Sequence, residues 1–131
     1  MALRIVKSAA DIKPTDHVIR LVDSIPLAPD SPSGATVFGD TDLIGGKNIR
    51  FISEVVNPRS RMSLEAVVSH EIGHSLGLRH ETDADNPIRD KVGGRNLMRA
   101  VASDTTPKGT QINVHQIREI QRLNDVGELN R

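Results

Sequence analysis

Cysteine, tryptophan and tyrosine are all absent from this chain of 131 residues, and Phe38 and Phe51 are its only aromatic side chains. The lack of cysteine excludes a disulfide framework, thiol catalysis and a cysteine-ligated metal. Two aromatic rings offer little for stacking on nucleic-acid bases. They also leave the hydrophobic core to be built mainly from aliphatic side chains. The length is that of one domain, which buries about two-thirds of its unfolded surface without needing disulfides.

An excess of one charge is also missing, because 17 basic residues balance 17 acidic ones. This balance, without a long basic run, argues against nucleic acid or an anionic membrane as partner. No segment approaches transmembrane length, and residues 1–7 lack the apolar stretch of a secretory signal. We therefore expect a soluble monomer that binds neither nucleic acid nor membrane. Its compartment stays open, either cytoplasmic or exported in a processed form.

Short β-branched runs alternate with turn signals in the first half of the chain. They predict strands at residues 3–6, 18–22, 35–38 and 49–53, the last with room to extend to 56. Three prolines predict a loop over residues 25–34, and Gly45-Gly46 a turn within 40–48. Asn57-Pro58 or Ser60 then supplies a helix start signal.

Two helices are predicted in the second half. The first carries one apolar stripe that can pack against a sheet, formed by Leu64, Val67, Val68, Ile72 and Leu76. The second is amphipathic over residues 114–129 and is expected to turn inward Ile117, Ile120, Leu123 and Val126. Strands followed by helices indicate an α/β or α+β fold.

The strongest signal is the run from His70 to His80, which has the pattern H-E-x-x-H-x-x-G-x-x-H. Residues four apart share one face of a helix, so His70 and His74 can bind a common metal ion. Glu71 lies one step round the helix, within reach of a water on that metal. Gly77 can end the helix in a left-handed conformation, after which the chain returns with His80 as third ligand.

Three histidines leave the fourth position of a zinc ion to water, whereas a structural zinc has four protein ligands. Zinc lowers the pKa of such a water to about 7. Glu71 can accept a proton from that water and pass it to a leaving amine. These groups together are those needed to hydrolyse a peptide bond, with one catalytic Zn²⁺ as the cofactor.

The extended motif resembles that of the metzincin clan of zinc endopeptidases. In this clan a methionine lies on a tight turn beneath the zinc, and Met98 is the only methionine after the motif. The resemblance implies a small mixed twisted sheet over an active-site helix, followed by a C-terminal helix. It also implies one metallopeptidase domain, 1–131, with an N-terminal part (1–77) and a C-terminal part (78–131). A substrate-binding edge strand is expected at Ala35, Thr36, Val37, Phe38 and Gly39.

The chain departs from several metzincin families. Ala100 stands where astacin-like and serralysin-like members have a tyrosine that can swing onto the metal. Glu81 resembles the astacin residue after the third histidine, but the next four residues do not continue that signature. Cysteines that hold a second zinc in archaemetzincin-like proteins are absent, and the space for a long first helix is short. The pattern is that of a minimal metzincin of unplaced family.

Two function classes remain open from the sequence. The first is a zinc endopeptidase that cuts an extended protein or peptide substrate. The alternative is a zinc-stabilised binding module with weak or no proteolysis, although Glu71 is not needed in such a site. Calcium is a less favoured further cofactor, because the acidic groups Asp40/Asp42 and Asp83/Asp85/Asp90 lack EF-hand spacing. His17 and His115 are interpreted as surface or helix-face histidines.

Overall fold

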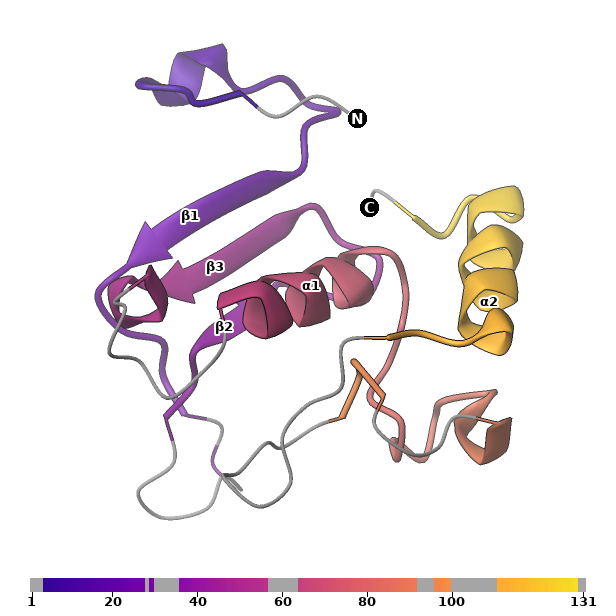
Figure 1. The fold of residues 1–131 in the computed structure, drawn as a ribbon. Coiled ribbons are helices and arrows are strands. Elements are labelled where there is room, and N and C mark those ends of the chain that lie inside the picture. Colours follow the sequence, from indigo (N-terminus) through magenta and orange to yellow (C-terminus); the bar gives the residue numbers. More distant parts are fainter. Residues whose placement is uncertain are drawn as a thin grey trace.

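The structure is a computed structural model that describes residues 4–27, 29, 36–56, 64–91, 96–99 and 111–129. Its elements in chain order are η1 (Ala9–Asp11), β1 (Val18–Val22), β2 (Gly39–Thr41), β3 (Asn48–Ile52), η2 (Ser53–Val56), α1 (Leu64–Ser75), η3 (Arg89–Lys91) and α2 (Val114–Asp125). Helix α1 lies across one face of the sheet, and α2 stands beyond the C-terminal end of α1 (Figure 1). Within the described residues, no helix has the length and apolar character needed to cross a membrane.

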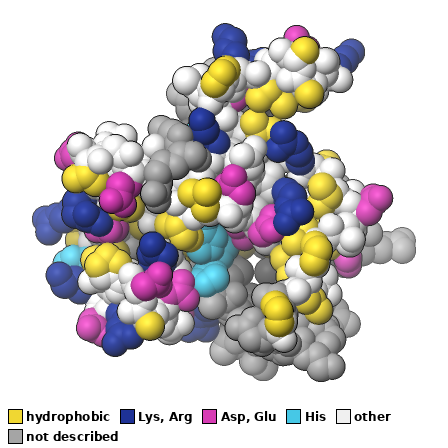
Figure 2. Space-filling model, turned by 180° about the vertical axis from the view of Figure 1, so that it is seen from behind, with side chains coloured by type: hydrophobic (Ala, Val, Ile, Leu, Met, Phe, Trp, Pro, Cys, Tyr) yellow, Lys and Arg dark blue, Asp and Glu magenta, His cyan; other side chains and the backbone are white. Residues whose placement is uncertain are grey.

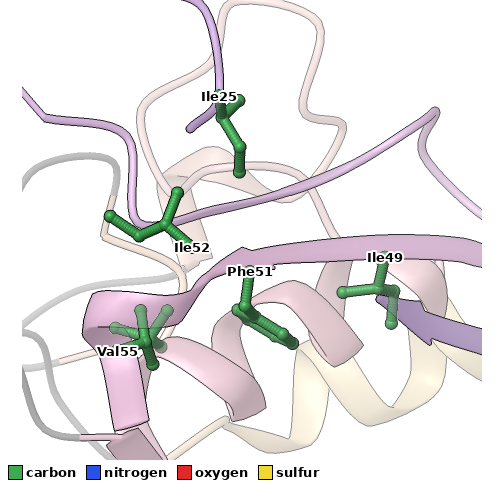
Figure 3. Packing of buried hydrophobic residues seen from close by; sticks show 6 residues of the cluster. Ile25, Ile49, Phe51, Ile52 and Val55 are labelled. Atoms are coloured by element: carbon green, nitrogen blue, oxygen red, sulfur yellow. The ribbon is translucent and has the colours of Figure 1, made fainter. Parts of the chain in front are cut away.

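Among the described residues the sheet has three strands in the order β1-β3-β2, so β1 and β2 are the edges of this part. β1 runs parallel to β3, and β2 runs antiparallel to it. The expected mixed sheet is therefore confirmed. Side chains alternate between the faces of a strand, and Ile49 and Phe51 point from β3 towards α1 (Figure 3).

The core consists of two groups of buried side chains. The larger group packs between the sheet and α1 and contains Ile25, Ile49, Phe51, Ile52, Val55 and Val67. The smaller group joins the segment after α1 to the turn at residues 96–99 and contains Leu78, Leu97 and Met98. Ile112 and Ile120 pack against this second group from the α2 side. At the start of the predicted α1 stripe, Leu64 is instead 41% exposed.

The predicted strand at residues 35–38 is wrong in its position. Residues 36–38 are not in a strand, Ala35 lies outside the described residues, and β2 begins at Gly39. A strand needs a partner, and β3 ends at Ile52, whose N–H donates to the Phe38 carbonyl over 3.0 Å. After Ile52 the chain enters η2, so β3 offers no further hydrogen bonds to residues before Phe38 and the ladder stops.

Glycine and aspartate are poor strand formers, yet both lie in β2 because of their partners on β3. A Cβ atom on Gly39 would lie 2.7 Å from the Phe51 ring, so the ring covers this glycine. Asp40 faces Arg50 and accepts hydrogen bonds of 2.8 and 2.5 Å from its guanidinium. These hydrogen bonds raise the pKa of Arg50 above its ordinary value.

The predicted strand at residues 3–6 is also wrong for its described part, since residues 4–6 are outside any strand. Ile5 is 94% exposed and does not reach the sheet. Arg4 instead bonds to the Asp11 carbonyl and to the Asp16 carboxylate, so this segment folds on itself. The predicted helix start at Asn57-Pro58 or Ser60 lies outside the described residues.

Helix α2 is shorter than predicted, because Gly127 with φ 75° follows its last turn. The N–H groups of Gly127 and Glu128 bond back to Asn124 and Leu123, which closes a Schellman motif. Ile117 is 46% exposed, and Val126 is 57% exposed, so neither faces inward as predicted. The buried residues of the helix are Gln116 and Leu123.

Candidate metal centre

Helix α1 ends so that the chain returns to the face that carries His70 and His74. Gly77 has φ 92°, and its N–H bonds to the His74 carbonyl at 2.9 Å. The N–H of Leu78 bonds to the Gly73 carbonyl at 2.9 Å, which completes a second Schellman motif. The turn directs the chain towards His80.

The three histidines bring their Nε2 atoms together. The Nε2 atom of His74 lies 3.1 Å from that of His70 and 3.1 Å from that of His80. The remaining Nε2 pair, His70 and His80, is 3.3 Å apart. Tetrahedral zinc at about 2.0–2.1 Å from each imidazole nitrogen requires nitrogen atoms about 3.3–3.4 Å apart. The three nitrogens therefore form nearly the face that a tetrahedral ion needs.

The main chain determines which ring nitrogens carry protons. His70 Nδ1 lies 2.8 Å from the Leu97 carbonyl, and His74 Nδ1 lies 2.7 Å from the Leu78 carbonyl. A carbonyl oxygen can only accept, so both Nδ1 atoms donate, and in the neutral rings both Nε2 atoms keep a lone pair. Two lone pairs 3.1 Å apart repel each other unless a cation lies between them. The donor set thus fits a metal ion.

The surroundings support the same interpretation. His70 and His74 are buried, with 4% and 7% of their surface exposed, and His80 is partly exposed. In the described part of the chain these three residues form a group able to hold a metal. Histidine side chains gather near the centre of the face that Figure 2 shows. One side of the site is therefore open to solvent, as an added ligand requires.

Glu71 lies next to this group, is 7% exposed, and is contacted from the sheet. Thr41 on β2 places its hydroxyl oxygen 3.0 Å from Glu71 Oε2 and 3.0 Å from the Glu71 carbonyl oxygen. Both are acceptors, so the hydroxyl donates towards the carboxylate or the carbonyl. Strand β2 and helix α1 are thereby joined at Glu71.

Met98 is completely buried, in a turn formed by residues 96–99 that we call the Met-turn. A Cβ atom on Gly73 would lie 2.5 Å from the Met98 sulfur, so the thioether packs against α1 at a glycine. The Met98 carbonyl accepts a hydrogen bond of 3.0 Å from the N–H of Glu81. The Met-turn is thus held against both α1 and the segment after His80.

The segment after His80 is stabilised by its own side chains. Asp83 accepts a hydrogen bond of 3.0 Å from the His80 N–H, and its carboxylate lies 3.6 Å from His80 Nδ1. Asn86 is buried and donates to the His80 carbonyl at 2.9 Å. These contacts orient the third histidine, which no helix holds.

The remaining predicted groups are two histidines and the acidic residues suggested for calcium. His17 is on the surface before β1, with its Nδ1 2.7 Å from the Ser75 hydroxyl, and His115 is partly buried on α2. Carboxylates of the suggested calcium groups bond to nearby residues: Asp40 to Arg50, Asp42 to Asn48 and Leu43, Asp83 to His80, and Asp85 to Arg79. That calcium is a less favoured cofactor at these acidic groups stays a prediction.

Three residues near the site are not predicted from the sequence: Thr41, Asn96 and Gln116. Thr41 was assigned to a turn, and nothing local distinguishes it. Asn96 and Gln116 are buried polar residues, which hydrophobic periodicity does not detect. For Gln116 a signal existed, because Asn113 and Gln116 have the spacing of a capping box, and the structure contains that box.

Comparisons with known proteins provide a family. The family model for Matrixin matches residues 27–123, which cover β2, β3, α1, the three histidines, the Met-turn and most of α2, but not β1. Comparisons with curated proteins and with solved structures found no match. Because the Matrixin model covers about three-quarters of the chain and agrees with the histidine group, this protein belongs to the Matrixin family of metzincin-type zinc metallopeptidases.

Proposed function

We propose that this chain is a zinc-dependent endopeptidase that hydrolyses peptide bonds in an extended polypeptide. The observation that carries the proposal is the convergence of the Nε2 atoms of His70, His74 and His80 beside the Glu71 carboxylate. We assign the three histidines as zinc ligands and Met98 as the packed base of the site. The chain would act as one metallopeptidase domain with an N-terminal part (1–77) and a C-terminal part (78–131).

Zinc, when bound, supplies Lewis-acid chemistry, because it acidifies a water ligand and polarises the carbonyl under attack. Glu71 does the proton transfer: it accepts a proton from the attacking water and delivers it to the leaving amine. Thr41 donates to Glu71 and holds its carboxylate in place. The buried surroundings of Glu71 strengthen its interaction with these partners.

Strand β2 is the proposed substrate-binding edge. The N–H of Asp42 bonds to the Asn48 carbonyl and that of Ile52 bonds to the Phe38 carbonyl, so even-numbered residues here face β3. Hydrogen-bonding directions alternate along a strand, so the main-chain groups of Gly39 and Thr41 point away from β3. A substrate strand can pair with these groups and pass by Glu71.

The test is a digest of a peptide library by zinc-loaded protein, with and without chelator, beside metal analysis of the same sample. We expect one zinc per chain and cleavage that chelator abolishes and zinc restores. N-methylation of the substrate amides that pair with β2 should prevent cleavage, because it removes the donors. Zinc-loaded protein that cleaves no peptide would instead support the zinc-stabilised binding module.

A further inference from the structure

Two buried amide side chains face each other between the Met-turn and α2. Asn96 is 4% exposed and Gln116 is 2% exposed. Asn96 Nδ2 donates to Gln116 Oε1 at 2.8 Å, and Gln116 Nε2 donates to Asn96 Oδ1 at 2.9 Å. Neither residue is one of the three histidines or Glu71, so the site chemistry does not explain them.

The main chain determines the orientation of both amides. The Met98 N–H donates to Asn96 Oδ1 at 2.8 Å, and the Asn113 N–H donates to Gln116 Oε1 at 2.8 Å. A backbone N–H can only donate, so each amide oxygen must point towards the N–H from which it accepts. A flip of either amide would place donor against donor. The pair is therefore a rigid connection between α2 and the Met-turn.

This connection ends at a histidine. Leu97 lies between Asn96 and Met98, and its carbonyl accepts the 2.8 Å hydrogen bond from His70 Nδ1. The Leu97 N–H donates to the carbonyl of Gln111, a residue just before α2, at 2.9 Å. The peptide groups on both sides of Leu97 are thus held from the α2 side, and with them the oxygen that orients the His70 ring.

We propose that Gln116 is a positioning residue of the metal centre. It holds Asn96, Asn96 holds the Leu97 carbonyl, and that carbonyl keeps His70 in the tautomer and orientation that direct Nε2 to the ion. Partners that orient a metal-bound histidine strengthen metal binding. The inference rests on the proposed role of His70 as a zinc ligand. It adds that α2 contributes to metal affinity without touching the metal.

The test uses Gln116→Met, which keeps roughly the same volume and removes all the hydrogen bonds of the side-chain amide. The matched control is Gln121→Met, the same change at an exposed position of α2. Zinc affinity is measured by competition with a chromophoric chelator, at a temperature where circular dichroism shows both variants folded. We expect Gln116→Met to weaken zinc binding about tenfold, the lower end for partners of metal ligands. Gln121→Met should leave it unchanged.

A second readout is the visible absorption spectrum of the Co²⁺-loaded protein, which reports ligand geometry. We expect Gln116→Met to shift this spectrum and Gln121→Met to preserve it. A wild-type zinc affinity and spectrum in folded Gln116→Met would overturn the inference and leave the proposed function intact. Failure of the wild-type chain to bind one zinc would instead overturn the proposed function.

Gln116→Glu decides the case in which Gln116→Met does not fold. At mildly alkaline pH this change keeps the acceptor for Asn113 and Asn96 and replaces only the donor that faces Asn96 Oδ1. Its negative charge alone would strengthen cation binding, so weaker binding must come from lost geometry. Unchanged or tighter zinc binding would overturn the inference. Loss of folding in both variants would also overturn the inference, because the amide pair would then be needed for the fold as a whole and not for the orientation of His70.

Discussion

Two glycines allow the effect of packing behind the end of α1 on the free energy of unfolding to be separated from the effect of backbone conformation. Gly77 and Gly127 each follow a helix, with φ of 92° and 75°, and each closes a Schellman motif. Their surroundings differ. A Cβ atom on Gly77 would lie 2.4 Å from Leu123 Cδ1 and 3.0 Å from Leu129 Cδ2, whereas one on Gly127 meets nothing within 4 Å.

The expected costs follow from these differences. Alanine in a left-handed conformation costs about 1–2 kcal/mol, and both substitutions incur this cost. Carbon atoms in contact lie about 3.5–4.0 Å apart, so the Gly77 substitution also forces the Leu123 methyl group, by rotation or together with α2, to move by about 1 Å or more. Overpacking of this kind costs about 1–3 kcal/mol. We therefore expect Gly77→Ala to lower the free energy of unfolding by about 2–5 kcal/mol and Gly127→Ala by about 1–2 kcal/mol.

The assay is urea unfolding of the zinc-free proteins followed by far-ultraviolet circular dichroism, since the chain has no tryptophan. Zinc-free protein is used because metal binding to the native state would add to the measured stability. Truncation of Leu123 to alanine should cost less in the Gly77→Ala background than in the wild type, because it removes the overlap. Equal losses for Gly77→Ala and Gly127→Ala would refute the packing argument.

Three further predictions concern the site. Glu71→Gln should reduce peptide hydrolysis by at least about a hundredfold and keep one zinc per chain, because the amide cannot act as the base; near-normal turnover with zinc bound would contradict this role. Thr41→Val should lower kcat by about ten- to a hundredfold, since a hydrogen bond to a charged group contributes about 1.5–3 kcal/mol. Thr41→Ser should retain most activity in the same kinetic assay, and an unchanged kcat in folded Thr41→Val would remove Thr41 from the mechanism. Met98→Leu roughly conserves volume, so urea unfolding should show a loss below about 1.5 kcal/mol, and metal analysis should still find one zinc.

The parts of this protein that could be predicted from its sequence are those set by local spacing. β1 and β3 are runs of β-branched and apolar residues, and both lie within one residue of the predicted positions. The two α1 histidines are four residues apart, so helical geometry alone places them on one face. Gly77 and His80 follow within six residues of His74, which leaves the chain few paths between them.

The parts that could not be predicted depend on partners distant in the sequence. β2 lies where β3 offers hydrogen bonds, and its Gly39 and Asp40 are acceptable there only because of Phe51 and Arg50. Likewise Gln116 is buried and Ile117 is exposed, because the α2 position that faces the Met-turn is the one that pairs with the Asn96 amide. Hydrophobic periodicity assigns an inward face by polarity, and so it fails where a buried polar pair replaces an apolar contact.

The two ring nitrogens that orient His70 and His74 bond to main-chain carbonyls, those of Leu97 and Leu78. Every amino acid supplies a carbonyl, so these two contacts tolerate any side chain at positions 78 and 97 that preserves the backbone path. Substitutions there act through packing of the second core group, in which both leucines are buried. Saturation mutagenesis at these two positions should therefore yield a wide range of thermal stabilities within which the apolar variants still take up zinc. A chain that orients its ligands in this way can change the interior beneath the metal centre and retain the centre itself.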